Sequence, residues 1–197
     1  MSFRFRPQYS TRALIRCAGV RVGAALLAFC AAVFAPLHNV SAHDPSQHGF
    51  ALVMFDPPFP APGFSLPDLN GKPRTLESYR GQYVLLNFWA TWCPPCLEEM
   101  PSMEKLQQKF SAHPFTIVAA SSDEAGATAV QPFVDKLGVT FPILLDTNKE
   151  VAKVYGAQDL PLSFLIDPNG QVIAAAKGAR DWASKQAVEV IGELVAK

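Results

Sequence analysis

The chain has no excess of charge of either sign, because its 197 residues include 17 Lys and Arg and 17 Asp and Glu. This balance gives no support for binding to nucleic acid or to an anionic membrane, since both favour a basic protein surface. Charged residues are also few, at 17%, whereas hydrophobic residues make up 49%. That composition is typical of a compact globular domain with a substantial core.

Cysteine is scarce as well, with only four in the sequence. Cys17 and Cys30 lie in the N-terminal segment, so Cys93 and Cys96 are the pair left for the rest of the chain. One close pair excludes the disulfide framework that stabilises many small secreted domains. It also argues against zinc, which needs about four ligands, because few histidines follow residue 42: His43, His48 and His113. We therefore expect no metal at the cysteine pair.

Residues 1–42 have the features of a signal peptide. Five arginines and no acidic residue precede an apolar run over residues 22–37, and Val40-Ser41-Ala42 fits a small-x-small cleavage site. The apolar run is shorter than the roughly 20 residues that span a bilayer comfortably. The sequence therefore predicts export to the periplasm with a mature chain starting at His43, and an uncleaved membrane anchor is the alternative.

The rest of the chain alternates between apolar runs and helical patterns. Residues 43–60 are predicted to form a linker or extension, in which residues 50–55 could add an edge strand, and the main domain covers 61–197. Continuous apolar runs over 84–89 and 115–120 predict strands buried on both faces of a sheet. Further strands are expected at 64–66, 141–145, 162–167 and 171–176, and helices at 94–110, 128–137, 149–155 and 181–195, the last capped by Asp181. This order predicts a three-layer α/β domain.

The two cysteines lie where a buried strand passes into a helix. Cys93 is expected at the helix N-cap, where unpaired backbone N–H groups and the helix dipole favour a thiolate. Cys96 lies one turn further along, close enough to close a disulfide and less accessible. The arrangement predicts a redox site in which Cys93 attacks a disulfide and Cys96 resolves the mixed disulfide. The acidic pair Glu98 and Glu99 is interpreted as first-turn residues favoured by the dipole.

The two residues between the cysteines are both proline, and this affects the thiolate. Pro95 falls at the N2 position and has no N–H, so the Cys96 amide is the main donor left for a thiolate at Cys93. No histidine lies between the cysteines to add positive charge. Weak stabilisation of the reduced form makes a couple more reducing. We therefore expect a protein that donates electrons to other disulfides.

Residues 81–96 resemble the TlpA/ResA-like branch of the thioredoxin superfamily, and the similarity extends through 61–72, 141–146 and 164–170. The resemblance implies a thioredoxin fold with a central mixed sheet in a three-layer α/β/α arrangement, here with an N-terminal extension. It implies a thiol:disulfide oxidoreductase whose only redox group is the Cys93–Cys96 disulfide. It also implies protein thiols and disulfides as partners, such as an apocytochrome or a copper-site protein, and a membrane electron donor upstream.

The resemblance carries over two further features. Pro161 matches the family's cis-proline, which with Leu160 and the exposed side chain expected for Trp92 implies a docking surface for a partner chain. Glu124 aligns with a buried glutamate that could accept the proton of the resolving thiol, which requires burial to raise its pKa. Asp123 is adjacent, and the sequence leaves open which acid assists. An exposed loop position for Glu124 is the alternative.

Two other functions are compatible with parts of the sequence. A peroxide reductase of the peroxiredoxin type shares part of this architecture, but Ala90 stands three residues before Cys93, where such enzymes have threonine. A copper chaperone could use the soft sulfur atoms of Cys93 and Cys96, together with His43 and His48 of the new amino terminus.

Overall fold

A computed structural model of the chain describes residues 50–196. The predicted signal peptide and the histidines at positions 43 and 48 lie outside the described residues. Between residues 50 and 196, no helix is long and apolar enough to cross a membrane.

The centre of the domain is a six-stranded mixed sheet with the strand order β1-β8-β7-β4-β5-β6. Strand β4 pairs in parallel with β5 and antiparallel with β7, which places it in the middle of the sheet. Both apolar runs that predicted buried strands therefore form interior strands of the sheet, β4 and β5. The strands are β1 (Val53–Pro60), β4 (Tyr83–Trp89), β5 (Phe115–Ser121), β6 (Ile143–Leu145), β7 (Leu162–Ile166) and β8 (Gln171–Lys177).

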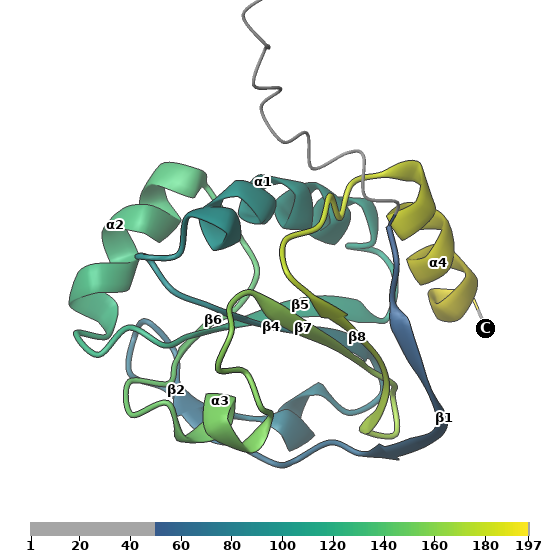
Figure 1. Cartoon of the computed structure of the whole chain (residues 1–197), viewed down its shortest axis with the longest axis horizontal. Coiled ribbons are helices and arrows are strands. Elements are labelled where there is room, and N and C mark those ends of the chain that lie inside the picture. Colours follow the sequence, from purple (N-terminus) through teal and green to yellow (C-terminus); the bar gives the residue numbers. More distant parts are fainter. Residues whose placement is uncertain (1–49, 197) are drawn as a thin grey trace, which may run out of the picture. The chain divides into compact units, whose positions relative to one another are not determined.

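Helices cover both faces of this sheet (Figure 1). Helices α1 (Pro94–Lys109), α2 (Ala127–Leu137) and α4 (Lys185–Val195) lie on one face, and α3 (Glu150–Val154) lies on the other. A two-stranded ribbon, β2 (Ser65–Pro67) with β3 (Pro73–Thr75), and a short 3₁₀ helix, η2 (Leu76–Tyr79), precede β4. The predicted three-layer α/β/α fold with a mixed central sheet is confirmed.

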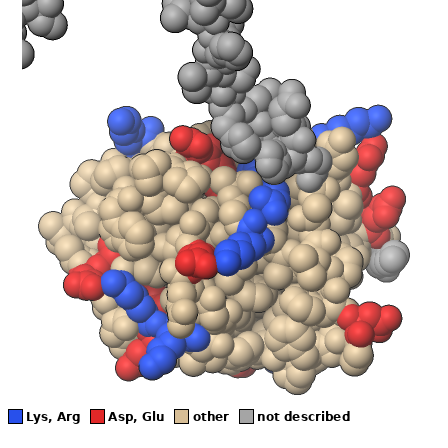
Figure 2. Space-filling view, viewed as in Figure 1, with Lys and Arg blue, Asp and Glu red and all other residues tan. Residues whose placement is uncertain are grey.

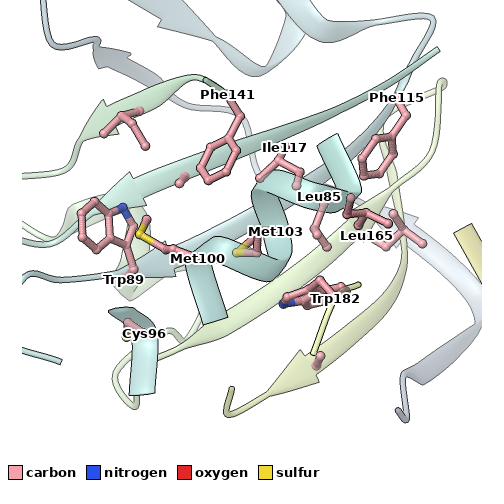
Figure 3. Close-up of a cluster of buried hydrophobic side chains, with 14 of the residues drawn as sticks. Leu85, Trp89, Cys96, Met100, Met103, Phe115, Ile117, Phe141, Leu165 and Trp182 are labelled. Carbon is pink, nitrogen blue, oxygen red and sulfur yellow. The ribbon is translucent and has the colours of Figure 1, made fainter. Parts of the chain in front are cut away.

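Side chains of β4 alternate between two hydrophobic clusters, one on each face of the sheet. Leu85 and Trp89 join the cluster under α1, whereas Leu86 and Phe88 join the cluster on the α3 side. Asn87 falls between Leu85 and Trp89 and is therefore a fully buried polar residue on the α1 side. Figure 3 shows the apolar side chains around this position, among them Cys96, Met100, Met103, Ile117 and Trp182.

Two predicted boundaries are wrong. The edge strand of the extension forms at Val53–Pro60 rather than at residues 50–55, and it pairs antiparallel with β8. The cap of α4 is Ser184, whose Oγ accepts from the Ala187 amide, rather than Asp181. Asp181 instead accepts from the Ala183 amide in the preceding turn. The helix therefore begins three residues later than a cap at Asp181 would place it.

Candidate active site

Cys93 and Cys96 form a disulfide at the N-terminus of α1, with 5.3 Å between their Cα atoms. Cys93 is the N-cap residue and the two prolines occupy the first helical positions, as the sequence predicts. The exposed fraction is 5% for Cys93 and 0% for Cys96. An incoming group therefore reaches the Cys93 sulfur before the Cys96 sulfur.

Asp123 fixes the loop that presents Cys93. Its carboxylate accepts from the Thr91 amide at 3.0 Å, from Thr91 Oγ1 at 2.6 Å and from Ser121 Oγ at 2.7 Å. The side chain is buried at the end of β5. Because both carboxylate oxygens are engaged with Thr91 and Ser121, Asp123 acts on the site by holding the turn before Trp92.

Removing this carboxylate should loosen the loop. Asp123→Ala leaves the Thr91 amide and two hydroxyl groups without their buried acceptor, which costs about 1–3 kcal/mol of unfolding free energy. Urea denaturation of the oxidised protein measures this loss. Glu124→Ala, at the exposed neighbouring position, is the matched control and should leave the unfolding midpoint nearly unchanged. If Asp123→Ala and Glu124→Ala lower the unfolding free energy equally, Asp123 does not hold the loop before Trp92.

Glu124 lies outside the site, so its predicted burial is wrong. Its side chain is 78% exposed and forms an ion pair with Lys149 Nζ at 2.7 Å. The hydrogen bond and charge of Lys149 lower the pKa of Glu124 instead of raising it. The chain turns after β5 so that Asp123 faces inward and Glu124 faces solvent.

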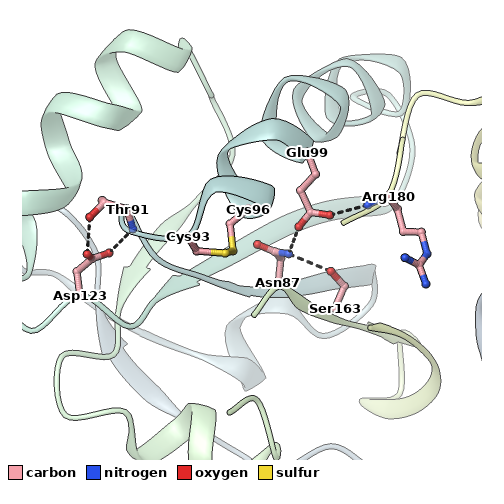
Figure 4. The surroundings of a disulfide bond; sticks show 8 residues. All are labelled: Asn87, Thr91, Cys93, Cys96, Glu99, Asp123, Ser163 and Arg180. Carbon is pink, nitrogen blue, oxygen red and sulfur yellow. Dashed lines mark hydrogen bonds between the residues drawn. A yellow bond between two sulfur atoms is a disulfide. The ribbon is translucent and has the colours of Figure 1, made fainter. Parts of the chain in front are cut away.

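Glu99, which the sequence analysis assigned to the first turn, is the buried acid next to the cysteines. It lies one turn after Cys96 on α1 and is only 3% exposed. Its carboxylate accepts from Asn87 Nδ2 at 2.9 Å, from the Arg180 amide at 3.0 Å and from Trp182 Nε1 at 3.1 Å. Figure 4 shows Glu99 with Asn87 and Arg180 beside the disulfide.

The environment of Glu99 raises its pKa. Burial disfavours the carboxylate, and this effect exceeds the opposing effect of the hydrogen bonds from Arg180, Trp182 and Asn87, so that the pKa rises from 4.5 to about 7. The first-turn interpretation is therefore wrong, since this side chain stabilises no exposed helix end. A spacing of three residues from Cys96 was the available signal, because positions i and i+3 share a helix face.

Two of the three predicted docking residues, Trp92 and Leu160, border a cavity of about 380 Å³, whereas Pro161 is not among the residues that line it. Trp92 is 63% exposed at one wall, and Leu160, whose peptide bond to Pro161 is cis, forms another. Lys149, the N-cap of α3, and Lys153, in the last turn of α3, also line the cavity. On the face shown in Figure 2, basic and acidic side chains lie around a broad uncharged surface, with no large patch of one sign.

No group of three or more His, Cys, Asp or Glu residues in the described part of the chain is arranged to hold a metal ion. The histidines of the copper-chaperone interpretation lie outside that part. Neither that interpretation nor the peroxide-reductase interpretation is tested by the geometry, and both stay predictions.

Comparisons with known proteins agree with this geometry. The family model described as "AhpC/TSA family" matches residues 59–175. The chain is 44% identical over 118 residues to "Thiol-disulfide oxidoreductase ResA" of Bacillus thuringiensis subsp. konkukian (strain 97-27), covering 60% of this chain and 68% of the relative. It is 39% identical over 135 residues to the protein of the same name from Halalkalibacterium halodurans, covering 68% and 74%.

Solved structures give the same result. The "putative Thiol:disulfide interchange protein DsbE from Chlorobium tepidum" has a TM-score of 0.62 at 30% identity, covering 74% of this chain and 97% of that one. A "putative protein disulfide isomerase from Bacteroides thetaiotaomicron" has a TM-score of 0.64 at 29% identity, covering 71% and 89%. With a disulfide at the tip of a helix in a thioredoxin-like fold, the chain belongs to the AhpC/TSA family and is a thiol-disulfide oxidoreductase similar to ResA.

Proposed function

We propose that the protein reduces disulfides of other exported proteins, with Cys93 as nucleophile and Cys96 as resolving thiol. The Cys93 thiolate attacks one sulfur of the target disulfide, forms a mixed disulfide and releases the other target sulfur as a thiolate. Cys96 then attacks the Cys93 sulfur, closes the Cys93–Cys96 disulfide and releases the second target thiolate. Two electrons pass to the target. The placement of Cys93 as the outer sulfur at the N-cap of α1 carries this proposal.

The local backbone supports the reducing direction. Pro95 offers no N–H to a Cys93 thiolate, and the Cys96 amide donates to the Cys93 carbonyl oxygen at 3.1 Å. Few donors are therefore left to stabilise the reduced form, which makes the couple a better reductant. Equilibration with glutathione buffers measures the reduction potential. A value near about −120 mV, that of a strong periplasmic oxidant, would contradict the reducing role.

Glu99 supports the second half of the reaction. Cys96 must lose its proton as it attacks, and a general base with a pKa near the working pH is the most effective acceptor. Burial raises the pKa of Glu99 to about 7, and the side chain projects from α1 one turn after Cys96. We assign Glu99, in place of Glu124, as the group that takes this proton.

The cavity beside Trp92 and Leu160 is the proposed binding site for the polypeptide that carries the target disulfide. A segment lying there would pass Pro161 and reach the Cys93 sulfur. An apocytochrome or a copper-site protein as target, and a membrane protein as the source of electrons, remain our proposals on the resemblance alone. The periplasmic location rests on the basic and apolar segments within residues 1–42.

The charge at this cavity should affect target choice. Lys149 is paired with Glu124, whereas no ion pair of Lys153 is found within residues 50–196. Lys153→Glu should slow reduction of a disulfide peptide with acidic flanks by about two- to fivefold at low salt, with the effect fading at high salt. Initial rates with acidic, neutral and basic peptides measure it. Lys136→Glu, which changes net charge equally on α2, is the control. If both variants change the rates equally, the cavity does not seat the peptide.

A further inference from the structure

One buried polar atom at the active site has no partner in the oxidised protein. Asn87 is fully buried in β4, and its amide nitrogen donates to Glu99 Oε1 at 2.9 Å and to Ser163 Oγ at 3.0 Å. Its carbonyl oxygen has no hydrogen-bond partner. Buried carbonyl groups are nearly always paired, because an unpaired one has lost its hydration without compensation. This oxygen therefore requires an explanation.

The position of Asn87 directs that oxygen toward the cysteines. Asn87 alternates with Leu85 and Trp89, which pack in the same cluster as Cys93 and Cys96. In Figure 4 the carbonyl oxygen of Asn87 points toward the disulfide and away from Glu99 and Ser163.

The opposite orientation of the amide is disfavoured by Glu99. Glu99 Oε1 receives its hydrogen bond from Asn87 Nδ2, and the two other donors bind Oε2. A rotated amide would place a carbonyl oxygen against Oε1, and two acceptors at that distance repel whenever Glu99 is ionised. With Glu99 ionised, the carbonyl oxygen thus stays on the side of the disulfide.

Reduction creates the donor that this oxygen lacks. A disulfide sulfur has no hydrogen, whereas two electrons and two protons convert the pair into two thiols, each with an S–H donor. We propose that in the reduced protein the Cys96 thiol donates a hydrogen bond to Asn87 Oδ1, which makes Asn87 a redox-dependent positioning residue. The inference rests on the proposed use of this disulfide as the redox pair.

This hydrogen bond distinguishes the two cysteines. An acceptor facing a thiol stabilises the S–H form and opposes the thiolate. Asn87 therefore keeps Cys96 protonated until a mixed disulfide forms, while Cys93 at the helix N-terminus supplies the thiolate. The carbonyl also favours the dithiol over the disulfide, because only the dithiol satisfies it.

Infrared spectroscopy of the S–H stretch tests the contact directly. In the full chain with Cys17→Ser, Cys30→Ser and Cys93→Ser, Cys96 is the remaining thiol. Its S–H band should lie at lower frequency than in the same chain with Asn87→Leu, because a hydrogen bond weakens the S–H bond. Ser163→Ala, which removes the other amide contact, should leave the band in place. An S–H band unchanged by Asn87→Leu would overturn the proposal.

Two further measurements keep the proposal testable if Asn87→Leu does not fold. In the unsubstituted chain labelled with ¹³C-asparagine, the reduced-minus-oxidised spectrum should show one side-chain carbonyl band shifting to lower frequency, and no shift would contradict the contact. Where the variant folds, its equilibrium constant for reduction by glutathione should fall about fivefold, as expected for one lost hydrogen bond. These readouts need no protein target, so they can succeed even if the proposed reductase activity fails.

Discussion

Cys93→Ser reduces turnover with a disulfide substrate to the rate of the uncatalysed exchange, whereas Cys96→Ser stops the reaction after its first half. The thiolate is the nucleophile in thiol–disulfide exchange, and a serine hydroxyl at the same helix terminus does not ionise near neutral pH. Cys96 has no exposed surface, so it cannot replace Cys93 as the attacking sulfur. Without Cys96, the mixed disulfide at Cys93 has no internal thiol to resolve it.

The two variants are separated by their products. Reduced Cys96→Ser should release one target thiol per chain and remain covalently bound to the target, which a non-reducing gel shows directly. Cys93→Ser should release none and bind none. Cys17→Ser and Cys30→Ser belong in every sample, because these two thiols could otherwise capture the target. If Cys93→Ser, and not Cys96→Ser, remains covalently bound to the target, then Cys96 is the attacking cysteine and Cys93 the resolving one.

The local part of the site could be predicted from the sequence. Cys93 at the N-cap and prolines at the first helical positions follow from residue preferences within a few positions of each other. The apolar runs of β4 and β5 identify the sheet centre in the same way. These features need no knowledge of distant residues.

The acid of the site could not be predicted, because its environment is built by distant segments. Arg180 and Trp182, which bind the Glu99 carboxylate, lie 81 and 83 residues further along the chain, and Asn87 reaches it from β4. Near Glu99 in the sequence, its spacing of three residues from Cys96 is the one feature that distinguishes it from Glu98, which is exposed. Glu124 was misplaced for the same reason, since its partner Lys149 belongs to the segment before α3.

The burial of Glu99 should also appear in the pH dependence of stability. The pKa of Glu99 is about 7 in the folded protein and has its ordinary value of 4.5 in the unfolded chain. Between these two pH values, the folded protein keeps a proton that the unfolded chain has lost. Stability is therefore highest below about pH 4.5 for this group and falls as the pH rises through about 7, by roughly 3 kcal/mol. Glu99→Gln lacks this titrating group, so the unfolding free energy of the unsubstituted protein minus that of the variant should fall by this amount in urea denaturations from pH 4 to 8.

The same substitution should slow resolution of the mixed disulfide. When Cys93 carries thionitrobenzoate, attack by Cys96 releases a coloured thiolate, and the rate should rise with pH through about 7 as Glu99 ionises. Glu99→Gln should lower this rate by about 100-fold, the usual contribution of a general base, and remove that inflection. Glu98→Gln changes the adjacent, exposed acid and should leave both rate and profile intact. A structural role alone would move stability without moving this inflection, so an unchanged pH profile in Glu99→Gln would exclude Glu99 as the proton acceptor.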